Sequence, residues 1–174
     1  MQQNTTKVKY LVLSAMFAAL IFVLTAYLHI PSHTGYTHVG DAFIYMAASL
    51  LPTPYAIGAS VVGAAMADAL SGYVIWVVPT IIIKALTVFC FTNKAKTILC
   101  KRNLFGLIPA FALCVGGYYL AEVIIVQNWI SPLAGITGYF VQIGFSGGLY
   151  LVLGFALDRM GFKQRNRIFS QNNV

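Results

Sequence analysis

The chain has 174 residues, of which 59% are hydrophobic and only 9% are charged, and its mean hydropathy is +0.80. Soluble domains carry about 25% charged residues, so this composition excludes an ordinary soluble protein and predicts one integral membrane domain over residues 1–174. The net charge of +7 does not indicate nucleic-acid binding. Nearly all Lys and Arg lie near the chain ends or in the connector Asn93–Asn103, as in cytoplasmic loops of membrane proteins.

The first apolar run, Tyr10–Leu28, is 19 residues long, which suits a membrane-spanning helix and exceeds the apolar core of a cleaved signal peptide. Basic residues before this run place the N-terminus in the cytoplasm, and basic residues in the connector Asn93–Asn103 place the connector there as well. The chain must therefore cross the membrane an even number of times between the N-terminus and the connector. The stretch between Tyr10–Leu28 and the connector therefore holds one or three spans. Three spans leave no long apolar segment outside the bilayer, and we expect them at Tyr36–Leu51, Tyr55–Leu70 and Tyr73–Phe91.

Two further apolar runs, Leu104–Gln127 and Leu133–Leu157, complete an all-α membrane protein with six transmembrane helices and both termini cytoplasmic. Pro52 and Pro54 predict a tight cytoplasmic turn, because proline ends helices. The long first external loop, His29–Gly40, is expected to fold as a lid over the outer mouth of the bundle. Its three histidines predict no metal site, because Pro31 disfavours the helix that their spacing would need.

Lys84 is the only charge in the run Tyr73–Phe91, and counting helical rise places it near the bilayer midplane. A buried ammonium is costly unless it faces a partner or a polar cavity. The acids that could meet it are Asp41, Asp68, Glu122 and Asp158. The same counting places Asp41 and Asp68 near the external surface and Glu122 about 8 Å below it. Two interpretations stay open: a structural ion pair, or a ligand pocket lined by Lys84 and Glu122.

Small residues recur at four-residue spacing in three predicted helices, which lets helix backbones approach closely in lipid. The three sets are the pair Ala15/Ala19, the triplet Ala59/Gly63/Ala67 and the pair Gly144/Gly148. Packing within the chain explains each of them. For Ala15 and Ala19, docking onto another membrane subunit is the alternative.

Three segments resemble one family of membrane proteins: Val39–Tyr45, Ala67–Tyr73 and Pro79–Lys84. Together with the six-helix pattern and the Ala15/Ala19 pair, they resemble the substrate-binding S component of an energy-coupling factor (ECF) vitamin transporter. The resemblance covers nearly the whole chain and is nearest to the riboflavin, hydroxymethylpyrimidine and pyridoxine branch.

The resemblance implies a subunit of the bacterial plasma membrane that captures a vitamin from outside and delivers it inward. Its implied partners are a transmembrane coupling subunit, onto which Ala15 and Ala19 dock, and two ABC ATPases. The chain has no GxxxxGK[ST] motif, so ATP hydrolysis is expected of the partners, and the chain itself is expected to be no enzyme and to need no cofactor.

The predicted ligand pocket is aromatic with a few polar groups, as small-molecule sites commonly are. The residues expected to contact the ligand are Lys84, Glu122, Asp68, Tyr36, His38, Asp41, Tyr45, Trp76, Tyr119, Trp129 and Tyr139. One cation without an arginine cluster disfavours a multiply anionic cargo. A hydroxymethylpyrimidine- or pyridoxine-like heterocycle is therefore expected first and riboflavin second. Two other function classes are a stand-alone ion-coupled secondary carrier and a small intramembrane enzyme.

Overall fold

The computed structural model describes residues 2–31, 36–166 and 169. Six main helices follow one another in this part of the chain, with a two-stranded hairpin after the first, short 3-10 turns before the fourth and the sixth, and a short helix after the last. In chain order the elements are α1 Gln2–Ala26, β1 His29–Pro31, β2 Tyr36–His38, α2 Asp41–Leu50, α3 Thr53–Leu70, η1 Val74–Trp76, α4 Val77–Phe89, α5 Lys101–Val126, η2 Ser131–Gly135, α6 Ile136–Arg159 and α7 Phe162–Arg165.

Three segments in the described chain are long and apolar enough to cross a membrane: Thr5–Ala26, Lys101–Val126 and Ser131–Arg159. Shorter apolar helices occupy Asp41–Leu50 and Val74–Phe89. These elements confirm the prediction of an all-α membrane protein. With 10 residues, α2 is about 15 Å long, roughly half the hydrocarbon thickness of a bilayer. The number of crossings and the side on which the termini lie stay predictions.

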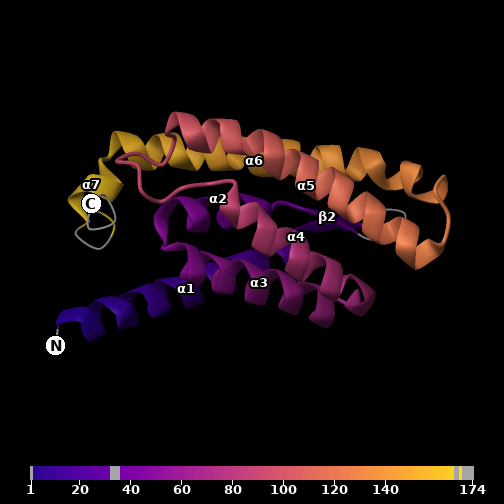
Figure 1. Cartoon of the computed structure of the whole chain (residues 1–174), viewed down its shortest axis with the longest axis horizontal. Helices are drawn as coiled ribbons and strands as arrows, with labels where there is room; N and C mark the ends of the chain where they lie inside the picture. The colour runs from indigo at the N-terminus through magenta and orange to yellow at the C-terminus, as the bar shows by residue number, and fades with distance from the viewer. Residues whose placement is uncertain (1, 32–35, 167–168, 170–174) are drawn as a thin grey trace.

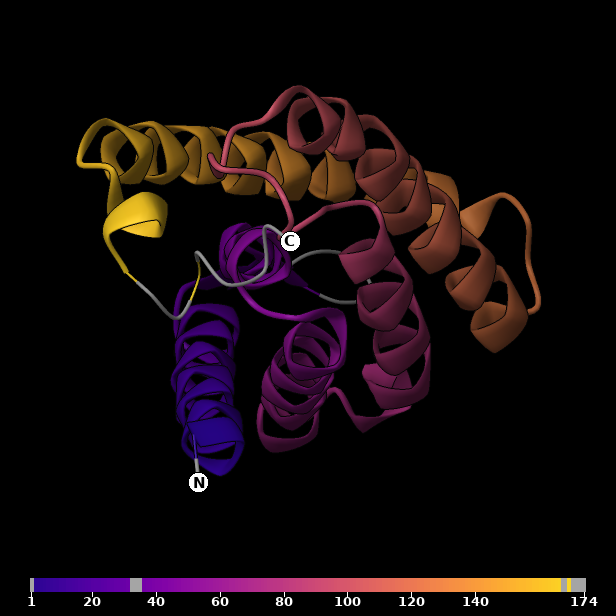
Figure 2. The same cartoon turned by 60° about the vertical axis from the view of Figure 1, so that its left-hand side comes forward.

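The helices α1, α3, α4, α5 and α6 form an open arc around α2. Helix α1 packs on α3, α3 on α4, α4 on α5 and α5 on α6, while α2 contacts α1, α3, α4 and α6 (Figures 1 and 2). A small residue allows α3 to approach α1 closely: a Cβ atom on Gly63 of α3 would lie 2.6 Å from the carbonyl oxygen of Ala18 in α1. Ala59 and Ala67 are buried on α3 as well, so this stripe serves packing within the chain.

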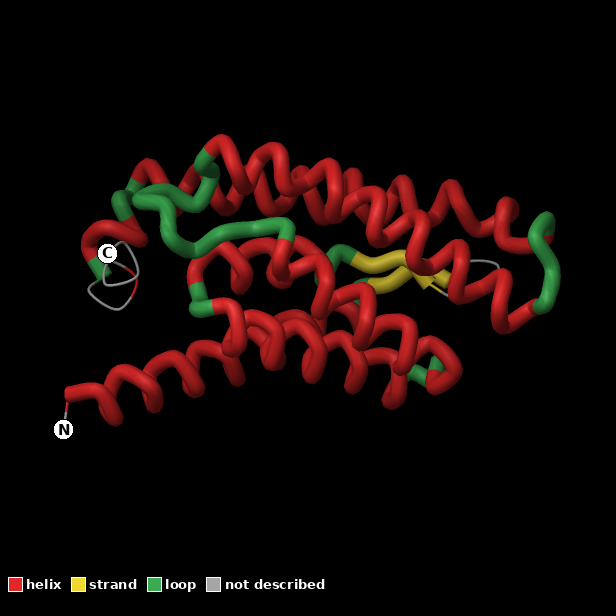
Figure 3. The backbone as a smooth tube through the Cα atoms, viewed as in Figure 1, coloured by secondary structure: helices red, strands yellow, loops and turns green. Residues whose placement is uncertain are grey.

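The predicted helix Tyr36–Leu51 is wrong over its first turns. Residues Tyr36–His38 form β2, which pairs antiparallel with β1 so that His29 lies opposite His38. Helix α2 begins only at Asp41. The hairpin lies inside the bundle, between the α1/α3 layer and the α5/α6 layer (Figure 3). The chain therefore reaches Asp41 at the level of Lys84, deeper than counting from the surface predicted. His33 lies outside the described residues.

The turns between helices follow the sequence more closely. Pro52 precedes α3, which begins at Thr53, as proline at a helix start allows. Helix α3 ends at Leu70, and Gly72 has a φ of +86°, a conformation that favours glycine. The predicted helix Tyr73–Phe91 is shorter than expected, because η1 occupies its first turn and α4 ends at Phe89.

Polar contacts tie the bundle together at the end opposite the hairpin, called here the α7 end. The Nζ of Lys163 in α7 donates to the carbonyl oxygen of Ser49 at 2.9 Å. The amide of Asn103 donates to the Ser49 hydroxyl at 3.1 Å and to the carbonyl oxygen of Ile98 at 2.8 Å. The Asp158 carboxylate accepts the backbone N–H of Ile98 at 2.7 Å. These bonds join α2, α5, α6 and α7 to the connector before α5.

Candidate functional site

A pocket lies between the hairpin, η1 and helices α3 to α6, at the hairpin end of the bundle. The space within it is about 340 Å³, open solvent at its mouth included. Its walls are formed by Tyr36, His38, Asp68, Trp76, Thr80, Tyr118, Tyr139 and Gln142. Five of these eight residues were predicted from the sequence to contact a ligand: Tyr36, His38, Asp68, Trp76 and Tyr139.

Aromatic rings form one side of the pocket. The rings of Tyr118 and Tyr139 are stacked, with centroids 5.6 Å apart and planes 15° from parallel. Trp76 meets Tyr118 edge-on at 5.9 Å. These three side chains come from η1, α5 and α6, so the wall depends on the packing of three separate elements. Such faces bind planar heterocycles by stacking.

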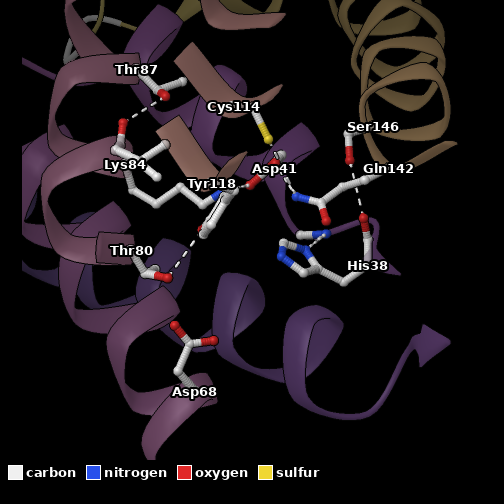
Figure 4. A network of polar contacts seen from close by, with 12 residues as sticks. His38, Asp41, Asp68, Thr80, Lys84, Thr87, Cys114, Tyr118, Gln142 and Ser146 are labelled. Atoms are coloured by element: carbon white, nitrogen blue, oxygen red, sulfur yellow. Dashed lines mark hydrogen bonds and ion pairs between the residues drawn. The ribbon is translucent and has the colours of Figure 1, made fainter. Parts of the chain in front are cut away.

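Asp68, near the end of α3, provides a carboxylate in the pocket wall. It is 5% exposed, and its Oδ1 accepts a hydrogen bond from the hydroxyl of Tyr36 on β2. Its Oδ2 is buried and has no hydrogen-bond partner among the described residues. The neighbouring Thr80 hydroxyl is bonded to the hydroxyl of Tyr118 at 3.0 Å (Figure 4). Asp68 therefore fixes the hairpin with one oxygen, while the other makes no hydrogen bond of normal geometry and has the Thr80 hydroxyl near the carboxylate.

Lys84 lies behind this wall rather than in it. Its Nζ donates to Oδ1 of Asp41 at 2.7 Å, and Gln142 donates its Nε2 to Oδ2 of the same carboxylate at 2.8 Å (Figure 4). Lys84 is 1% exposed and Asp41 2% exposed, and the ammonium also lies 5.1 Å from the centroid of the Tyr118 ring. A buried ion pair needs such additional hydrogen bonds to offset its desolvation. The structure thus favours the ion-pair interpretation of Lys84, with Asp41 as the partner.

His38 has a defined tautomer. The backbone N–H of Gly40 donates to its Nδ1 at 3.2 Å, so the proton of the neutral imidazole sits on Nε2. Figure 4 shows the ring on the side of the pocket opposite Thr80 and Tyr118. In the described structure the backbone of His38 accepts a bond from Ser146 of α6 at 3.5 Å. His38 therefore offers a hydrogen-bond donor from a strand that α6 holds in place.

Four other predicted residues lie outside the pocket lining. Glu122 is fully buried behind Tyr139, whose hydroxyl donates to it at 3.1 Å. Tyr45 belongs to the apolar core toward the α7 end, where its ring stacks on Phe91 at 4.9 Å. The hydroxyl of Tyr119 donates to the carbonyl oxygen of Trp129 at 2.8 Å, and Trp129 is 67% exposed. Glu122 thus supports the wall, while the other three lie away from it.

Three lining residues were not among the predicted contacts: Thr80, Tyr118 and Gln142. Thr80 precedes Lys84 by one helical turn, and Tyr118 precedes Glu122 by the same spacing, so both share a helix face with a buried charge. Gln142 is a polar side chain within an apolar span. A sequence analysis that weighted uncharged polar residues in apolar helices as heavily as charged ones would have identified these three residues as candidate ligand contacts.

The small residues Ala15 and Ala19 are both exposed on α1. Larger apolar side chains that are exposed beside them include Leu11, Val12, Met16 and Leu20. The contact of α1 with α3 uses Ala18 and Ile21 instead. Ala15 and Ala19 are thus not part of the packing of α1 on α3. Gly144 and Gly148 on α6 are exposed as well, and a Cβ atom at either would meet nothing within 4 Å in the described structure.

A comparison with protein families identifies the chain. The family model for the ECF-type riboflavin transporter S component matches residues 5–159. No curated protein matches the chain. The match includes every lining residue of the pocket and all six main helices apart from the first residues of α1. The chain belongs to the ECF S component family, and it is a membrane-embedded, vitamin-binding transporter subunit rather than an enzyme.

Proposed function

We propose that this chain captures riboflavin from outside the cell in the pocket at the hairpin end. The sequence alone placed a hydroxymethylpyrimidine- or pyridoxine-like heterocycle first and riboflavin second. The matching family model is named for riboflavin, which reverses that order. The observation that carries the proposal is the aromatic wall of Trp76, Tyr118 and Tyr139, which offers stacking faces to a planar ring.

The hairpin is the proposed lid of this pocket. Tyr36 bonds Asp68 of α3, and the Thr37 hydroxyl donates to the carbonyl oxygen of Gly138 in α6 at 3.2 Å. The hairpin thereby bridges α3 and α6. A ligand beneath it would be covered by Tyr36 and His38, both of which line the pocket.

Transport is proposed to require a coupling subunit and two ABC ATPases in a bacterial plasma membrane, with both termini of this single six-helix domain in the cytoplasm. Exposed Ala15 and Ala19 are the proposed docking position. Short side chains let a partner helix approach the backbone of α1 closely. Ligand contact is proposed for the five predicted residues that line the pocket, while Lys84, Asp41 and Glu122 are proposed to act behind it.

Tryptophan fluorescence tests the ligand directly, because Trp76 lines the pocket and Trp129 is exposed. The protein in detergent micelles is titrated with riboflavin, hydroxymethylpyrimidine and pyridoxine. A Trp129→Phe variant keeps Trp76 as reporter and should retain riboflavin-dependent quenching. The matched Trp76→Phe variant keeps Trp129 and should lose most of it. Tighter binding of another vitamin than of riboflavin would restore the order expected from the sequence.

Uptake into proteoliposomes tests the partnership. Riboflavin should accumulate only when the coupling subunit, both ATPases and ATP are present. Transport by the chain alone, driven by an ion gradient, would instead support the secondary carrier.

A further inference from the structure

The pocket wall holds a carboxylate with no opposite charge beside it. Asp68 is 5% exposed, and its Oδ2 makes no hydrogen bond of normal geometry in the described chain, with the Thr80 hydroxyl near the carboxylate. A buried polar atom left unpaired is costly, so a ligand that donates a hydrogen bond there gains more than one that cannot. Tyr36 already satisfies Oδ1, so Oδ2 is the oxygen left for the ligand.

The described lining contains no Lys or Arg that could compensate this charge. Among the described residues, Lys84 places an ammonium close behind the wall, but it is paired with Asp41 at 2.7 Å and is 1% exposed. A second carboxylate, Glu122, stands behind Tyr139 and accepts its hydroxyl at 3.1 Å. The His38 imidazole accepts the Gly40 N–H in its neutral form and adds no positive charge. The pocket is therefore electrostatically unfavourable for an anion.

We propose that Asp68 is a specificity-determining residue that selects the unphosphorylated vitamin over its phosphate monoester. Its Oδ2 accepts an N–H or O–H of the neutral ligand, and its charge opposes a phosphate group in the same pocket. This inference rests on the proposed function and adds which chemical form of the vitamin the site accepts. It applies to any neutral heterocyclic vitamin that occupies the pocket.

The expected size follows from the two effects. A hydrogen bond to a charged group changes affinity about ten- to a hundredfold. Repulsion between two like charges that lie a few ångströms to a nanometre apart in a partly buried site lowers the affinity by roughly tenfold or more. Replacing Asp68 by asparagine keeps the shape and an acceptor for Tyr36 but removes the charge. It should weaken binding of the neutral vitamin and at the same time relieve the repulsion of the ester.

The test measures affinities by calorimetry for the full chain in detergent micelles, with three pairs of probes. They are riboflavin and its 5′-phosphate, pyridoxine and its 5′-phosphate, and hydroxymethylpyrimidine and its phosphate. For the vitamin that binds, the wild type should prefer the neutral form, and Asp68→Asn should reduce the ratio of the two affinities about tenfold or more. This ratio does not depend on the fraction of folded protein, because both probes meet the same preparation.

Asp158→Asn is the matched control, an acid-to-amide change at the α7 end, far from the lining. It should leave the ratio unchanged. A wild type that binds the ester as tightly as the neutral vitamin, or an Asp68→Asn ratio equal to that of the wild type, overturns the inference and leaves vitamin capture standing. If no neutral vitamin binds the wild type, the proposed function and this inference fail together.

Discussion

Replacing Lys84 by methionine should destabilise the fold much more than it weakens ligand binding. The carboxylate of Asp41 accepts two hydrogen bonds, from Lys84 at 2.7 Å and from Gln142 at 2.8 Å, and it is 2% exposed. In Lys84→Met it would keep only the neutral amide bond while remaining buried. Removing one partner of a buried ion pair costs about 3–5 kcal/mol, because the other charge is left uncompensated.

Neutralising the orphaned carboxylate should reverse most of this loss. In the double variant Lys84→Met, Asp41→Asn, no buried charge remains at the pair, and the unpaired amide costs only about 1–3 kcal/mol. We therefore expect the double variant to be about 2 kcal/mol more stable than Lys84→Met alone. Glu122→Gln is the matched control: if Asp41 is the partner, it should not rescue Lys84→Met.

Unfolding by sodium dodecyl sulfate, titrated into dodecyl maltoside micelles and followed by tryptophan fluorescence, measures these free energies. In the folded fraction of Lys84→Met, affinity for riboflavin should change by less than about tenfold, because the ammonium does not line the pocket. The ion-pair reasoning would be refuted if Asp41→Asn added to the destabilisation by Lys84→Met. A large loss of affinity at unchanged stability would return Lys84 to the ligand site, as one interpretation of the sequence held.

Three further predictions address the docking face, the α7 end and the topology. Replacing both Ala15 and Ala19 by tryptophan should preserve riboflavin binding but abolish ATP-dependent uptake, because both positions are exposed on α1; loss of binding as well would indicate packing within the chain. Burial lowers the pKa of Lys163 to about 8, whereas the unfolded chain keeps this proton to about pH 10.4, so the unfolded state binds more protons between these values. Stability should therefore rise with pH from about 8 to 10 in the wild type relative to Lys163→Met, as measured by melting temperatures; a constant difference would contradict the burial argument. In a cysteine-free background, Asn128→Cys should react with an impermeant thiol reagent added outside cells and Lys94→Cys should not, and labelling of both would exclude the predicted topology.

The sequence was a good guide where a helix runs uninterrupted through the apolar layer. Helices α1, α5 and α6 cover most of the three long apolar runs, and Pro52 marked a real turn. It failed at Tyr36–His38, because a short stretch of aromatic and β-branched residues does not by itself distinguish a strand from the first turn of a helix. The strand is decided by its pairing with His29–Pro31, which lies outside the predicted helix.

The error at the hairpin also displaced the partner of Lys84. Counting helical rise from the surface assumed that Asp41 lay near the outer end of a full-length span. Because the hairpin enters the bundle first, Asp41 lies at the start of a short helix opposite Lys84. Their separation of 43 positions in the chain is bridged by tertiary packing that no local pattern encodes. Gln142, 101 positions from Asp41, also reaches this carboxylate only through tertiary packing.

The contacts at the α7 end bear on the route by which a captured molecule leaves. Beyond the pocket, the bundle is filled by the rings of Tyr45, Phe91 and Tyr150, and Asn103 binds the connector to α2 just beneath them. A passage straight through would have to separate these rings and break buried hydrogen bonds. The described structure therefore has a pocket that opens at one end of the bundle rather than a channel through it. If the pocket opens outward, as proposed, a captured molecule would leave by the mouth through which it entered, and inward delivery would require that mouth to turn toward the cytoplasm.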